Sequence, residues 1–253
     1  SHYPVNTIPK IMSGIDEESL AIGIYFYSSI FEKIIPVSST KVAEYIKILE
    51  NSYRFINISF INEFAKLTSL DNVDIFEVIE GAKTKPYGFT PFYPNWGVGG
   101  DCIPTVPMFL VDRGEKYGLR VSSIEYSDLI NKSMPHYWFN KVKKYIKKNV
   151  LILGITYKKD VNDLRNSQPL KFMELLIDNG VDASYYDPFI EMIEIKGKKL
   201  KSIKPTKNNL KKFDLIVIGT DHSDIPYYDL LNLKKYILDP FGRLPKSKYI
   251  ISF

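Results

Sequence analysis

Asn149-Val150-Leu151-Ile152-Leu153-Gly154 is the stretch of this 253-residue chain that decides its fold. An unbroken apolar run closed by a glycine predicts a strand that is buried on both faces and opens a new domain. The residues that follow alternate between helical and extended patterns, which predicts a helix over 167–179 and strands over 183–187, 213–219 and 236–239. Alternation of this kind is typical of an α/β domain with a parallel sheet.

A long helix is predicted upstream of this domain. Apolar or aromatic side chains recur there at steps of three or four residues, and a serine or threonine at 38–40 can cap its start. The stripe consists of Val42, Ile46, Leu49, Tyr53, Ile56, Phe60, Phe64 and Leu67. Such a long helix usually spans two subunits or two domains. Ile48, Phe55 and Ile58 add a second apolar face, so we expect burial on both sides.

The remaining elements complete a mixed α/β chain. Shorter helices are predicted over 75–82, 107–117 and 122–148. Pro135 should kink or interrupt the last of these. Residues 10–37 are predicted to form a strand, a helix capped by Asp16, and a second strand. The predicted order is therefore a remnant of one α/β domain, an all-helical centre and a second α/β domain.

The composition is that of an ordinary globular protein, with 45% hydrophobic and 25% charged residues. No apolar run reaches the ~20 residues that a membrane span needs, and no signal peptide opens the chain, so no membrane association is expected. A single cysteine excludes an internal disulfide and fits a reducing compartment, which predicts a cytoplasmic protein. The histidines lack metal-ligand spacing, so we expect no metal site.

The net charge of +5 comes almost entirely from lysine. The densest basic stretch, residues 196–212, holds eight lysines but no arginine and no aromatic residue. Nucleic-acid binding would favour both residue types, so we interpret this stretch as a solvated loop or hairpin and expect no nucleic-acid partner. A moderately positive field would also suit a phosphorylated small molecule.

The single cysteine lies in Gly97-Val98-Gly99-Gly100-Asp101-Cys102-Ile103-Pro104. Glycine lets a backbone adopt positive φ angles or approach a ligand closely, and proline fixes the exit from such a loop. A lone cysteine is more often a small buried hydrophobe. The glycine frame favours a presented thiol instead, which makes Cys102 a candidate nucleophile.

The longer segment 94–107 resembles the active-site loop of the nucleotide-sugar 6-dehydrogenases, which act on UDP-glucose, GDP-mannose or UDP-N-acetylhexosamines. Its Cys-Ile-Pro-x-x-Pro ending is most similar to the UDP-N-acetylhexosamine branch, of the N-acetylmannosamine type. Further blocks occur in the family's order, from about residue 9 to the end. These are Lys47 with Asn51, the block Gly154–Ser167, and the weaker Tyr186-Asp187-Pro188 and Gly219-Thr220-Asp221-His222.

The resemblance implies NAD-dependent oxidation of the C6 hydroxyl of a UDP-N-acetylhexosamine to a uronic acid, through a cysteine thioester. It implies that residues 1–38 end an N-terminal dinucleotide-binding domain and that 39–146 form a central helical dimerisation domain. Residues 147–253 would form a Rossmann-like domain that binds the UDP-sugar. It also implies a homodimer built on the long helix. The family's opening Gly-x-Gly-x-x-Gly turn does not occur in the sequence. We therefore expect an incomplete or truncated form that binds NAD poorly and turns over little by itself.

The family's site residues map onto this sequence by motif. The resemblance implies that Cys102 is the nucleophile and that Lys47 and Asn51, four residues apart on the long helix, stabilise an oxyanion at C6. Without the resemblance, Cys102 would more often be a buried structural residue, Lys47 a solvent-facing lysine and Asn51 an ordinary polar residue of a helix. The implied substrate-binding residues are Tyr93, Gly99, Tyr157, Lys158 and Arg243, and the implied cofactor contact is Arg165.

Two positions depart from the family's pattern. The aspartate usual four residues after the cysteine, thought to position the hydrolytic water, is Val106 here. Valine can neither accept a proton nor orient water. Asp101, directly before Cys102, replaces a small residue or histidine, and a nearby carboxylate disfavours a thiolate. Either thioester hydrolysis is impaired or Asp101 has taken over the role of base.

The sequence leaves one other function open and argues against another. The chain could be a non-catalytic truncated relative that binds a nucleotide-sugar or pairs with a full-length subunit, which Val106 slightly favours. A sugar-nucleotide epimerase would need a Tyr-x-x-x-Lys pair in a fitting helix together with a glycine-rich turn. The sequence lacks that combination.

Overall fold

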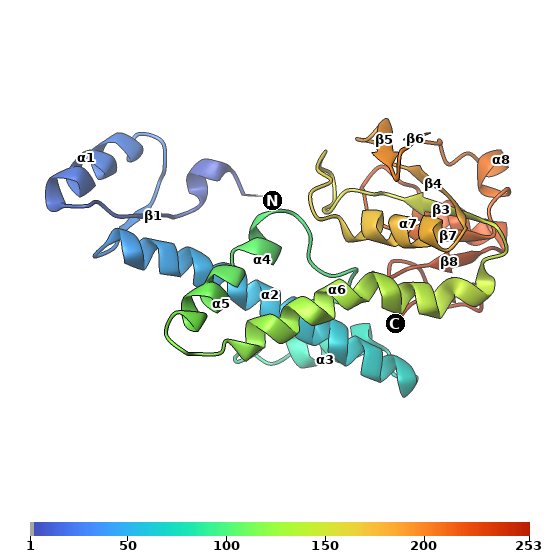
Figure 1. Ribbon diagram of the computed structural model, residues 1–253, viewed down its shortest axis with the longest axis horizontal. Helices are drawn as coiled ribbons and strands as arrows, with labels where there is room; N and C mark the ends of the chain where they lie inside the picture. Colours follow the sequence, from blue (N-terminus) through green and yellow to red (C-terminus); the bar gives the residue numbers. More distant parts are fainter. Residues whose placement is uncertain (1–2) are drawn as a thin grey trace. The chain divides into compact units, whose positions relative to one another are not determined.

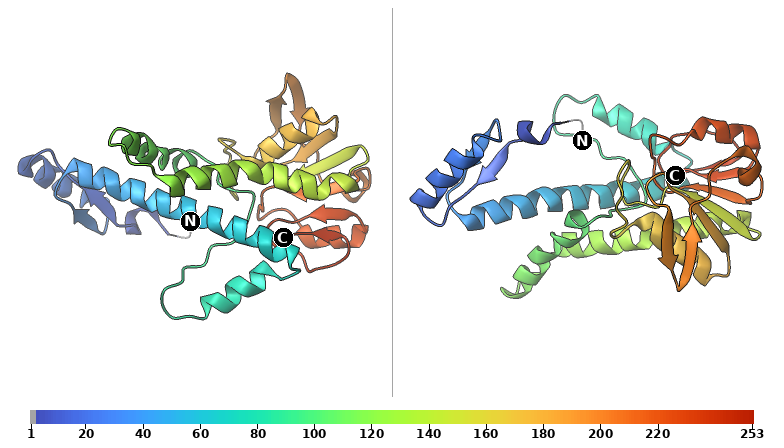
Figure 2. Two further views of the ribbon diagram at one scale, coloured as in Figure 1. Left: turned by 60° about the horizontal axis from the view of Figure 1, so that its bottom comes forward. Right: turned by 90° about the horizontal axis from the view of Figure 1, so that it is seen from above.

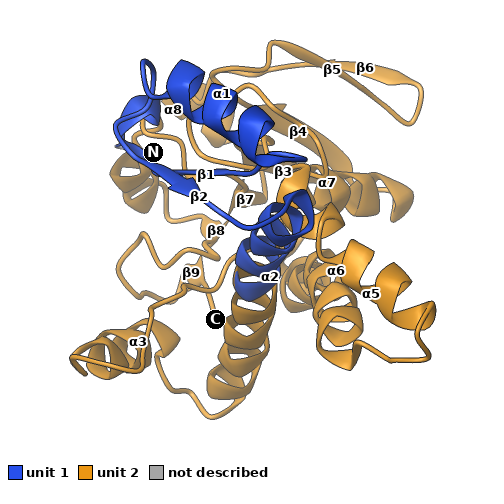
Figure 3. Cartoon of the chain, turned by 90° about the vertical axis from the view of Figure 1, so that its left-hand side faces the viewer, with its two compact units in different colours: residues 1–53 blue, residues 54–253 orange. Residues whose placement is uncertain are grey.

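The computed structural model describes residues 3–253, and the chain divides between Tyr53 and Arg54 into two compact units (Figure 3). The division falls inside helix α2 (Thr40–Leu70), so each unit contains part of that helix. The three-part division at residues 38 and 146 stays a prediction.

The first unit begins with a strand–helix–strand segment. Strands β1 (Lys10–Met12) and β2 (Ile34–Pro36) pair in parallel, and α1 (Glu17–Tyr27) connects them. A short 3₁₀ helix, η1 (Val5–Thr7), precedes β1. Asp16 caps α1, because its Oδ1 accepts a hydrogen bond from the Ser19 amide at 2.7 Å. The order predicted for residues 10–37 is confirmed.

Helix α2 is 31 residues long, as its periodicity predicted. Its start is capped by Ser39, whose Oγ accepts a hydrogen bond from the Val42 amide at 3.3 Å. The expectation of burial on both sides, which depends on a second subunit or domain, stays a prediction. Phe55 is fully buried, but Phe60 and Leu67 of the apolar stripe are 58% and 57% exposed.

The second half of α2 lies beside α6 (Ser122–Val142), and both helices run in the same direction (Figures 1 and 2). Polar contacts join the two helices, including Ser59 Oγ to the Ser127 carbonyl at 3.2 Å and Lys141 Nζ to Ser69 Oγ at 2.7 Å. The other helical elements of this region are α3 (Ile75–Lys83), α4 (Cys102–Thr105), α5 (Met108–Glu115) and the 3₁₀ turn η2 (Lys143–Tyr145).

Helix α6 continues through Pro135, so the predicted interruption there is wrong. Proline lacks the N–H that would bond to the Asn131 carbonyl. Packing sustains the helix instead, because Met134, Pro135 and Trp138 are buried. The Asn131 side chain adds hydrogen bonds to Ser59 Oγ at 2.6 Å and to the Ser127 carbonyl at 2.9 Å.

The C-terminal part of the second unit is the predicted α/β domain. Its five strands lie in the order β4-β3-β7-β8-β9, and every neighbouring pair is parallel. The strands are β3 (Asn149–Leu153), β4 (Asp182–Tyr186), β7 (Leu215–Ile218), β8 (Tyr236–Leu238) and β9 (Ile250–Ile251). Helix α7 (Gln168–Asp178) joins β3 to β4 and is capped by Ser167.

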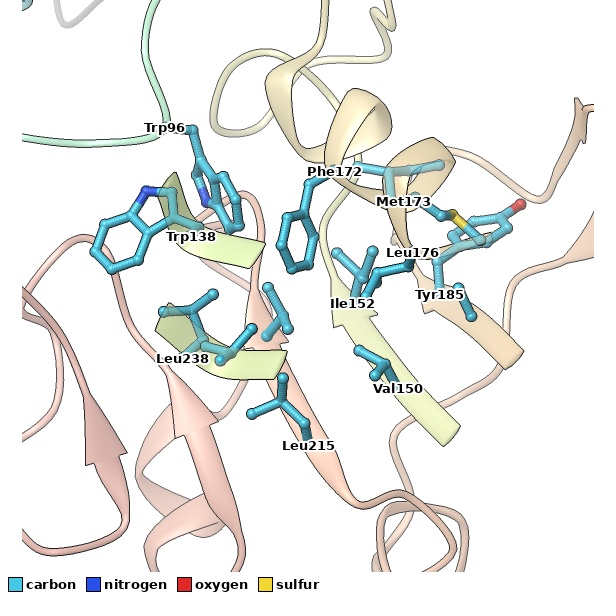
Figure 4. Packing of buried hydrophobic residues seen from close by; sticks show 14 of the residues in the cluster. Trp96, Trp138, Val150, Ile152, Phe172, Met173, Leu176, Tyr185, Leu215 and Leu238 are labelled. Atoms are coloured by element: carbon cyan, nitrogen blue, oxygen red, sulfur yellow. The ribbon is translucent and has the colours of Figure 1, made fainter. Parts of the chain in front are cut away.

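Alternate residues of the strands pack into two cores, one on each face of the sheet. Val150 and Ile152 face the core that α6 and α7 cover, whereas Leu151 and Leu153 face the other core. In the first core, Trp138 of α6 and Phe172 of α7 lie over the sheet together with Trp96 from the cysteine loop (Figure 4). The apolar run at residues 149–154 predicted a strand buried on both faces, and β3 confirms this prediction.

Part of the lysine-rich stretch forms a hairpin, which was one of the two expected forms. Strands β5 (Met192–Ile195) and β6 (Lys198–Lys201) pair antiparallel, and both turn residues, Lys196 and Gly197, have positive φ angles. The short helix α8 (Lys207–Leu210) follows, and the 3₁₀ helix η3 (Tyr227–Leu233) lies between β7 and β8.

Candidate functional site

The carboxyl ends of β3 and β7 form the switch point of the sheet. From β3 the chain passes through α7 to β4 on one side, whereas β7 pairs on the other side. Ligands of open parallel sheets bind at such points. The two strand ends approach so closely that a Cβ on Gly219 would lie 2.2 Å from the Gly154 carbonyl oxygen, and Gly154 has a φ of +82°. Only glycines permit this approach.

A cavity of about 220 Å³ lies at this edge. Segments that follow β3, β7 and β8 line it, together with part of the cysteine loop. The lining residues are Asn95, Trp96, Gly97, Gly99, Tyr157, Lys158, Lys159, Gln168, Pro169, Gly219, Thr220, Asp221 and Phe241. Three predicted site residues, Gly99, Tyr157 and Lys158, therefore meet here, and Lys159 adds a second ammonium group.

Arg243 reaches the cavity through an ion pair. Its guanidinium donates to the Asp221 carboxylate, with Nη2 2.8 Å from Oδ2. The loop that presents it is held by Asp239, which accepts hydrogen bonds from the Phe241 amide at 3.1 Å and the Leu244 amide at 2.8 Å. Burial raises the pKa of Asp239. Arg243 thus lies beside Asp221, one of the lining residues.

A buried polar network supports the loops around the cavity. His222 Nδ1 accepts a hydrogen bond from the Asp160 amide at 3.0 Å, so the imidazole proton is on Nε2. Nε2 lies 3.1 Å from both Thr156 Oγ1 and Asp187 Oδ2. Burial raises the pKa of Asp187, but hydrogen bonds from His222 and from the Ile155 amide outweigh burial and hold it below its ordinary value.

This network was missed as a functional feature of the sequence. Asp187 and His222 stand in the two weaker resemblance blocks; Asp187 directly follows β4, and His222 lies in the segment after β7. Polar residues that follow buried parallel strands meet at one sheet edge, and that position was the available signal.

The cysteine loop is held against the α/β domain by backbone and side-chain contacts. The Gly100 amide donates to the Arg165 carbonyl at 2.8 Å, and Asn166 Nδ2 donates to the Gly100 carbonyl at 2.9 Å. A Cβ on Gly99 or on Gly100 would each lie 2.7 Å from the Tyr157 side chain. The paired glycines therefore let Tyr157 pack directly on the loop.

Hydrogen bonds of residues 95–98 fix the start of the same loop. The indole Nε1 of the buried Trp96 donates to the Ile218 carbonyl at 3.0 Å, at the end of β7. Asn95 accepts a hydrogen bond from the Gly97 amide at 2.7 Å, and the Val98 amide donates to Asn131 of α6 at 3.2 Å. The loop thus joins the helical region to the sheet.

Cys102 is exposed and is the first residue of the short helix α4. Asp101 beside it pairs with Arg165, with Oδ2 and Nη1 3.2 Å apart. Arg165 also bonds Asp163 at 2.7 Å, and these hydrogen bonds hold the pKa of Asp163 below its ordinary value. The predicted cofactor contact therefore already has two carboxylate partners.

Three predicted residues are not among those that line the cavity. Tyr93 is not among its lining residues, and its hydroxyl donates to Glu80 of α3 at 2.5 Å. Lys47 and Asn51 occupy one turn of α2 in the first unit, where Lys47 is exposed and Asn51 is buried. Their placement next to Cys102 stays a prediction.

No helix among residues 3–253 is both long and apolar enough to cross a bilayer. The same residues contain no group of three or more His, Cys, Asp or Glu side chains arranged to hold a metal ion.

Comparisons with known proteins give a consistent result. UDP-N-acetyl-D-mannosamine dehydrogenase of Methanocaldococcus jannaschii is 32% identical over 228 residues, which cover 89% of this chain and 51% of that protein. The enzyme of the same name from Methanococcus vannielii is 30% identical, over 96% of this chain and 54% of that protein. This chain thus spans about half the length of these relatives.

The structure of a UDP-D-ManNAc dehydrogenase from Pyrococcus horikoshii has a TM-score of 0.80 and 26% identity, and the match covers 97% of this chain and 60% of that one. Residues 41–133 match the central domain of the UDP-glucose/GDP-mannose dehydrogenase family, and residues 151–243 match its UDP binding domain. The chain belongs to this family.

Proposed function

We propose that this chain supplies the nucleotide-sugar-binding and thiol-bearing parts of an NAD-dependent 6-dehydrogenase that acts on a UDP-N-acetylhexosamine. The observation that carries the proposal is the cavity at the switch point, where Tyr157 and Lys158 lie against the loop that bears Cys102. The relatives named above act on UDP-N-acetyl-D-mannosamine, which gives the substrate class.

The nucleotide end of the substrate would bind at the carboxyl edge of the sheet. A diphosphate brings negative charge, which the ammonium groups of Lys158 and Lys159 can neutralise. Arg243 would add a planar guanidinium, provided that it exchanges part of its bond to Asp221 for a bond to phosphate or sugar. Thr220 and Asp221 offer hydroxyl and carboxylate groups to the ligand's own donors.

Cys102 would form the covalent bond of the reaction. Its thiolate adds to the C6 aldehyde, so that a C–S bond forms and the carbonyl π electrons move to oxygen, which then takes a proton. After oxidation at C6, water attacks the thioester and releases the carboxylate and the thiol. We assign Lys47 and Asn51 to stabilise the oxygen's negative charge, as the resemblance implies.

NAD would supply the hydride acceptor in this family's reaction. Residues 3–253 contain no strand–Gly-x-Gly-x-x-Gly–helix turn, and the one predicted contact, Arg165, is bonded to Asp163 and Asp101. The described residues therefore do not by themselves form an NAD site.

A second function is favoured by one observation, the valine at position 106. Without a carboxylate at that position, Asp101 would have to activate the water, yet it is paired with Arg165. A chain that binds the nucleotide-sugar but does not hydrolyse a thioester would fit a binding subunit that pairs with a complete enzyme. The exposed apolar face of α2 would serve such pairing, or a homodimer, equally well.

Calorimetric titration of the chain with UDP and with UDP-N-acetylglucosamine tests the proposal. We expect both to bind, Lys158→Met to weaken binding at least about tenfold through loss of a charge-assisted hydrogen bond, and Cys102→Ser to leave binding unchanged. Lys148→Met, an exposed lysine before the opposite end of β3, is the matched control. If Lys148→Met weakened binding as much as Lys158→Met does, the result would contradict the assigned site.

A second experiment separates the two functions. The chain is mixed with the dinucleotide-binding half of a complete enzyme of the family, and NAD reduction is measured in the presence of the UDP-sugar. NAD reduction that Cys102→Ser abolishes supports the dehydrogenase. UDP-sugar binding without any NAD reduction supports the binding subunit.

A further inference from the structure

One amine of the α2–α6 contact has an unusual environment, the side chain of Lys141 in the last turn of α6. Its Nζ donates to Ser69 Oγ of α2 at 2.7 Å and to the Tyr137 hydroxyl at 3.3 Å. It also lies over two aromatic rings, 5.6 Å from the centre of the Tyr137 ring and 5.8 Å from that of Trp138. Hydroxyl groups and aromatic faces therefore hold the amine in one place.

These surroundings do not neutralise the charge of Lys141. No carboxylate among residues 3–253 forms an ion pair with it, and its other titratable neighbours are Tyr137 and, on α2, Lys66. The Nζ of Lys66 lies 5.3 Å from the centre of the same Tyr137 ring. From the C-terminal segment, Phe253 stacks on Tyr137 and adds a further ring. An ammonium group at this position is desolvated without gaining a counter-charge.

The consequence is a weakly basic amine. Burial lowers the pKa of Lys141 from 10.5 to about 8, and no charged group opposes this effect. Burial also lowers the pKa of Lys66, but Glu63 acts against it there. At pH 7.5 about a quarter of Lys141 is then uncharged, against about 0.1% of an ordinary lysine. Because the hydroxyls of Ser69 and Tyr137 can donate as well as accept, the uncharged amine keeps its hydrogen bonds.

We propose that Lys141 is a modification site, at which small acyl phosphates transfer their acyl group to the amine more readily than to the exposed lysines. The side chain is only partly buried, so a small donor can reach it. The uncharged amine attacks the carbonyl carbon, so that an N–C bond forms and the C–O bond to phosphate breaks. Phosphate leaves with the bonding electrons, and the nitrogen passes its extra proton to solvent. The proposal does not depend on the reaction assigned above.

Acylation would change the contact between α2 and α6. An amide nitrogen carries no charge, so the attraction of the ammonium group to the rings of Tyr137 and Trp138 would be lost. Its single N–H can still donate to Ser69 Oγ. Trp138 belongs to the core that underlies the cysteine loop, so the modification would act next to that core.

The test is acetylation of the full chain with acetyl phosphate at several pH values, followed lysine by lysine by peptide mass spectrometry. Lys132, paired with Asp128 at 2.6 Å, and the exposed Lys143 are the internal controls. At pH 7.5 Lys141 should react at least about fivefold faster than either, because its larger uncharged fraction outweighs the slower attack of a weaker base. Its rate should level off above pH 8, whereas the control rates should keep rising toward pH 10.

Two variants at position 69 test the cause. Ser69→Asp places a carboxylate beside the amine, which favours the charged form. It should slow acetylation of Lys141 at pH 7.5 at least about fivefold and move the levelling to higher pH. Ser69→Ala introduces no charge and should keep the pH at which the rate levels off.

The wild-type chain alone can overturn the proposal. A Lys141 that reacts no faster than Lys132 and Lys143 would do so, as would a Lys141 rate that keeps rising above pH 8 as theirs do. Equal rates in Ser69→Asp and Ser69→Ala would overturn the assigned cause, the lack of a carboxylate beside the amine.

Discussion

The parallel sheet and helix α2 place their apolar side chains in opposite ways. In β3, residues 150–153 are apolar and fully buried. In the second half of α2, Phe60, Phe64 and Leu67 are exposed, whereas Ser59 and Asn62 are at most 1% exposed. The sheet domain therefore completes its core within the chain, and the helix does not.

The difference teaches what hydrophobic periodicity can and cannot predict. A period of 3.6 residues indicates a helix, but it does not say which surface covers the stripe. Large exposed apolar patches mark interaction surfaces, which agrees with the proposed pairing of two chains along α2. The following predictions test whether the two regions differ as described, from the largest expected effect to the smallest.

Phe172→Ala should remove the most stability, because Phe172 is fully buried between α7 and the sheet. Loss of a core phenylalanine typically costs about 3–5 kcal/mol. Phe64→Ala is the matched control, and its cost to a monomeric chain should stay below about 1 kcal/mol. Urea unfolding of both variants measures the difference, and equal losses would contradict the contrast between sheet and helix.

Phe60→Glu combined with Phe64→Glu should abolish association along α2, because burying charge in an apolar interface is unfavourable. We expect the mass in solution, measured by light scattering, to fall from about twice the chain mass to the chain mass of 29.2 kDa. Tyr228→Glu, which alters a 70% exposed residue of the α/β domain, should leave the mass unchanged. A wild-type chain that is already monomeric would remove α2 as a homodimer surface.

Asp187→Asn should cost about 1–3 kcal/mol, because a hydrogen-bonded buried carboxylate is lost. The lowered pKa of Asp187 means that its contribution to stability is complete above the ordinary aspartate pKa, near 3.8, and is lost as the pH falls through the lower folded value. Denaturant midpoints measured from pH 6 downward should fall for the wild type in that acidic range. In Asp187→Asn the denaturant midpoint should fall less steeply with pH in this range. If the midpoints of the variant and the wild type fell in parallel, the stabilising role assigned to the Asp187 carboxylate would be contradicted.

Trp96→Phe should cost about 1 kcal/mol more than Trp138→Phe, which is roughly the net value of one hydrogen bond. Both indoles are buried in the same core, but Trp96 donates to the Ile218 carbonyl, whereas Nε1 of Trp138 has no partner among residues 3–253. Thermal unfolding of the two variants measures the difference. Indistinguishable variants would mean that packing alone holds the start of the cysteine loop.

The elements of the fold were largely predictable, because they depend on local patterns. The caps at Asp16 and Ser39, the long helix and the buried strand at 149–153 all follow from short stretches of sequence. Pro135 does not interrupt α6, because the buried packing of the helix outweighs a single missing hydrogen bond, and the alternative of a kink there stays a prediction. For residues 196–212 the sequence allows either a loop or a hairpin, because the strands of the hairpin have only four residues each and β6 is rich in lysine.

The candidate site was predictable only in part. Gly99, Tyr157 and Lys158 meet at one cavity, and motif resemblance alone indicated them. The pairing of Arg165 with Asp101 joins segments 64 residues apart, and no local pattern predicts such a contact.

The contacts of residues 95–101 with the sheet bear on how such proteins can be recombined. The loop precedes helix α6 in the chain, yet the Gly100 amide, the Gly100 carbonyl and Trp96 bond to partners beyond residue 147. A chimera cut at residues 146 and 147 would join a cysteine loop from one parent to a Tyr157 and an Asn166 from another. Parents that differ at these contacts would yield a folded chimera with a misplaced thiol, so residues 95–101 and 147–253 should be exchanged together.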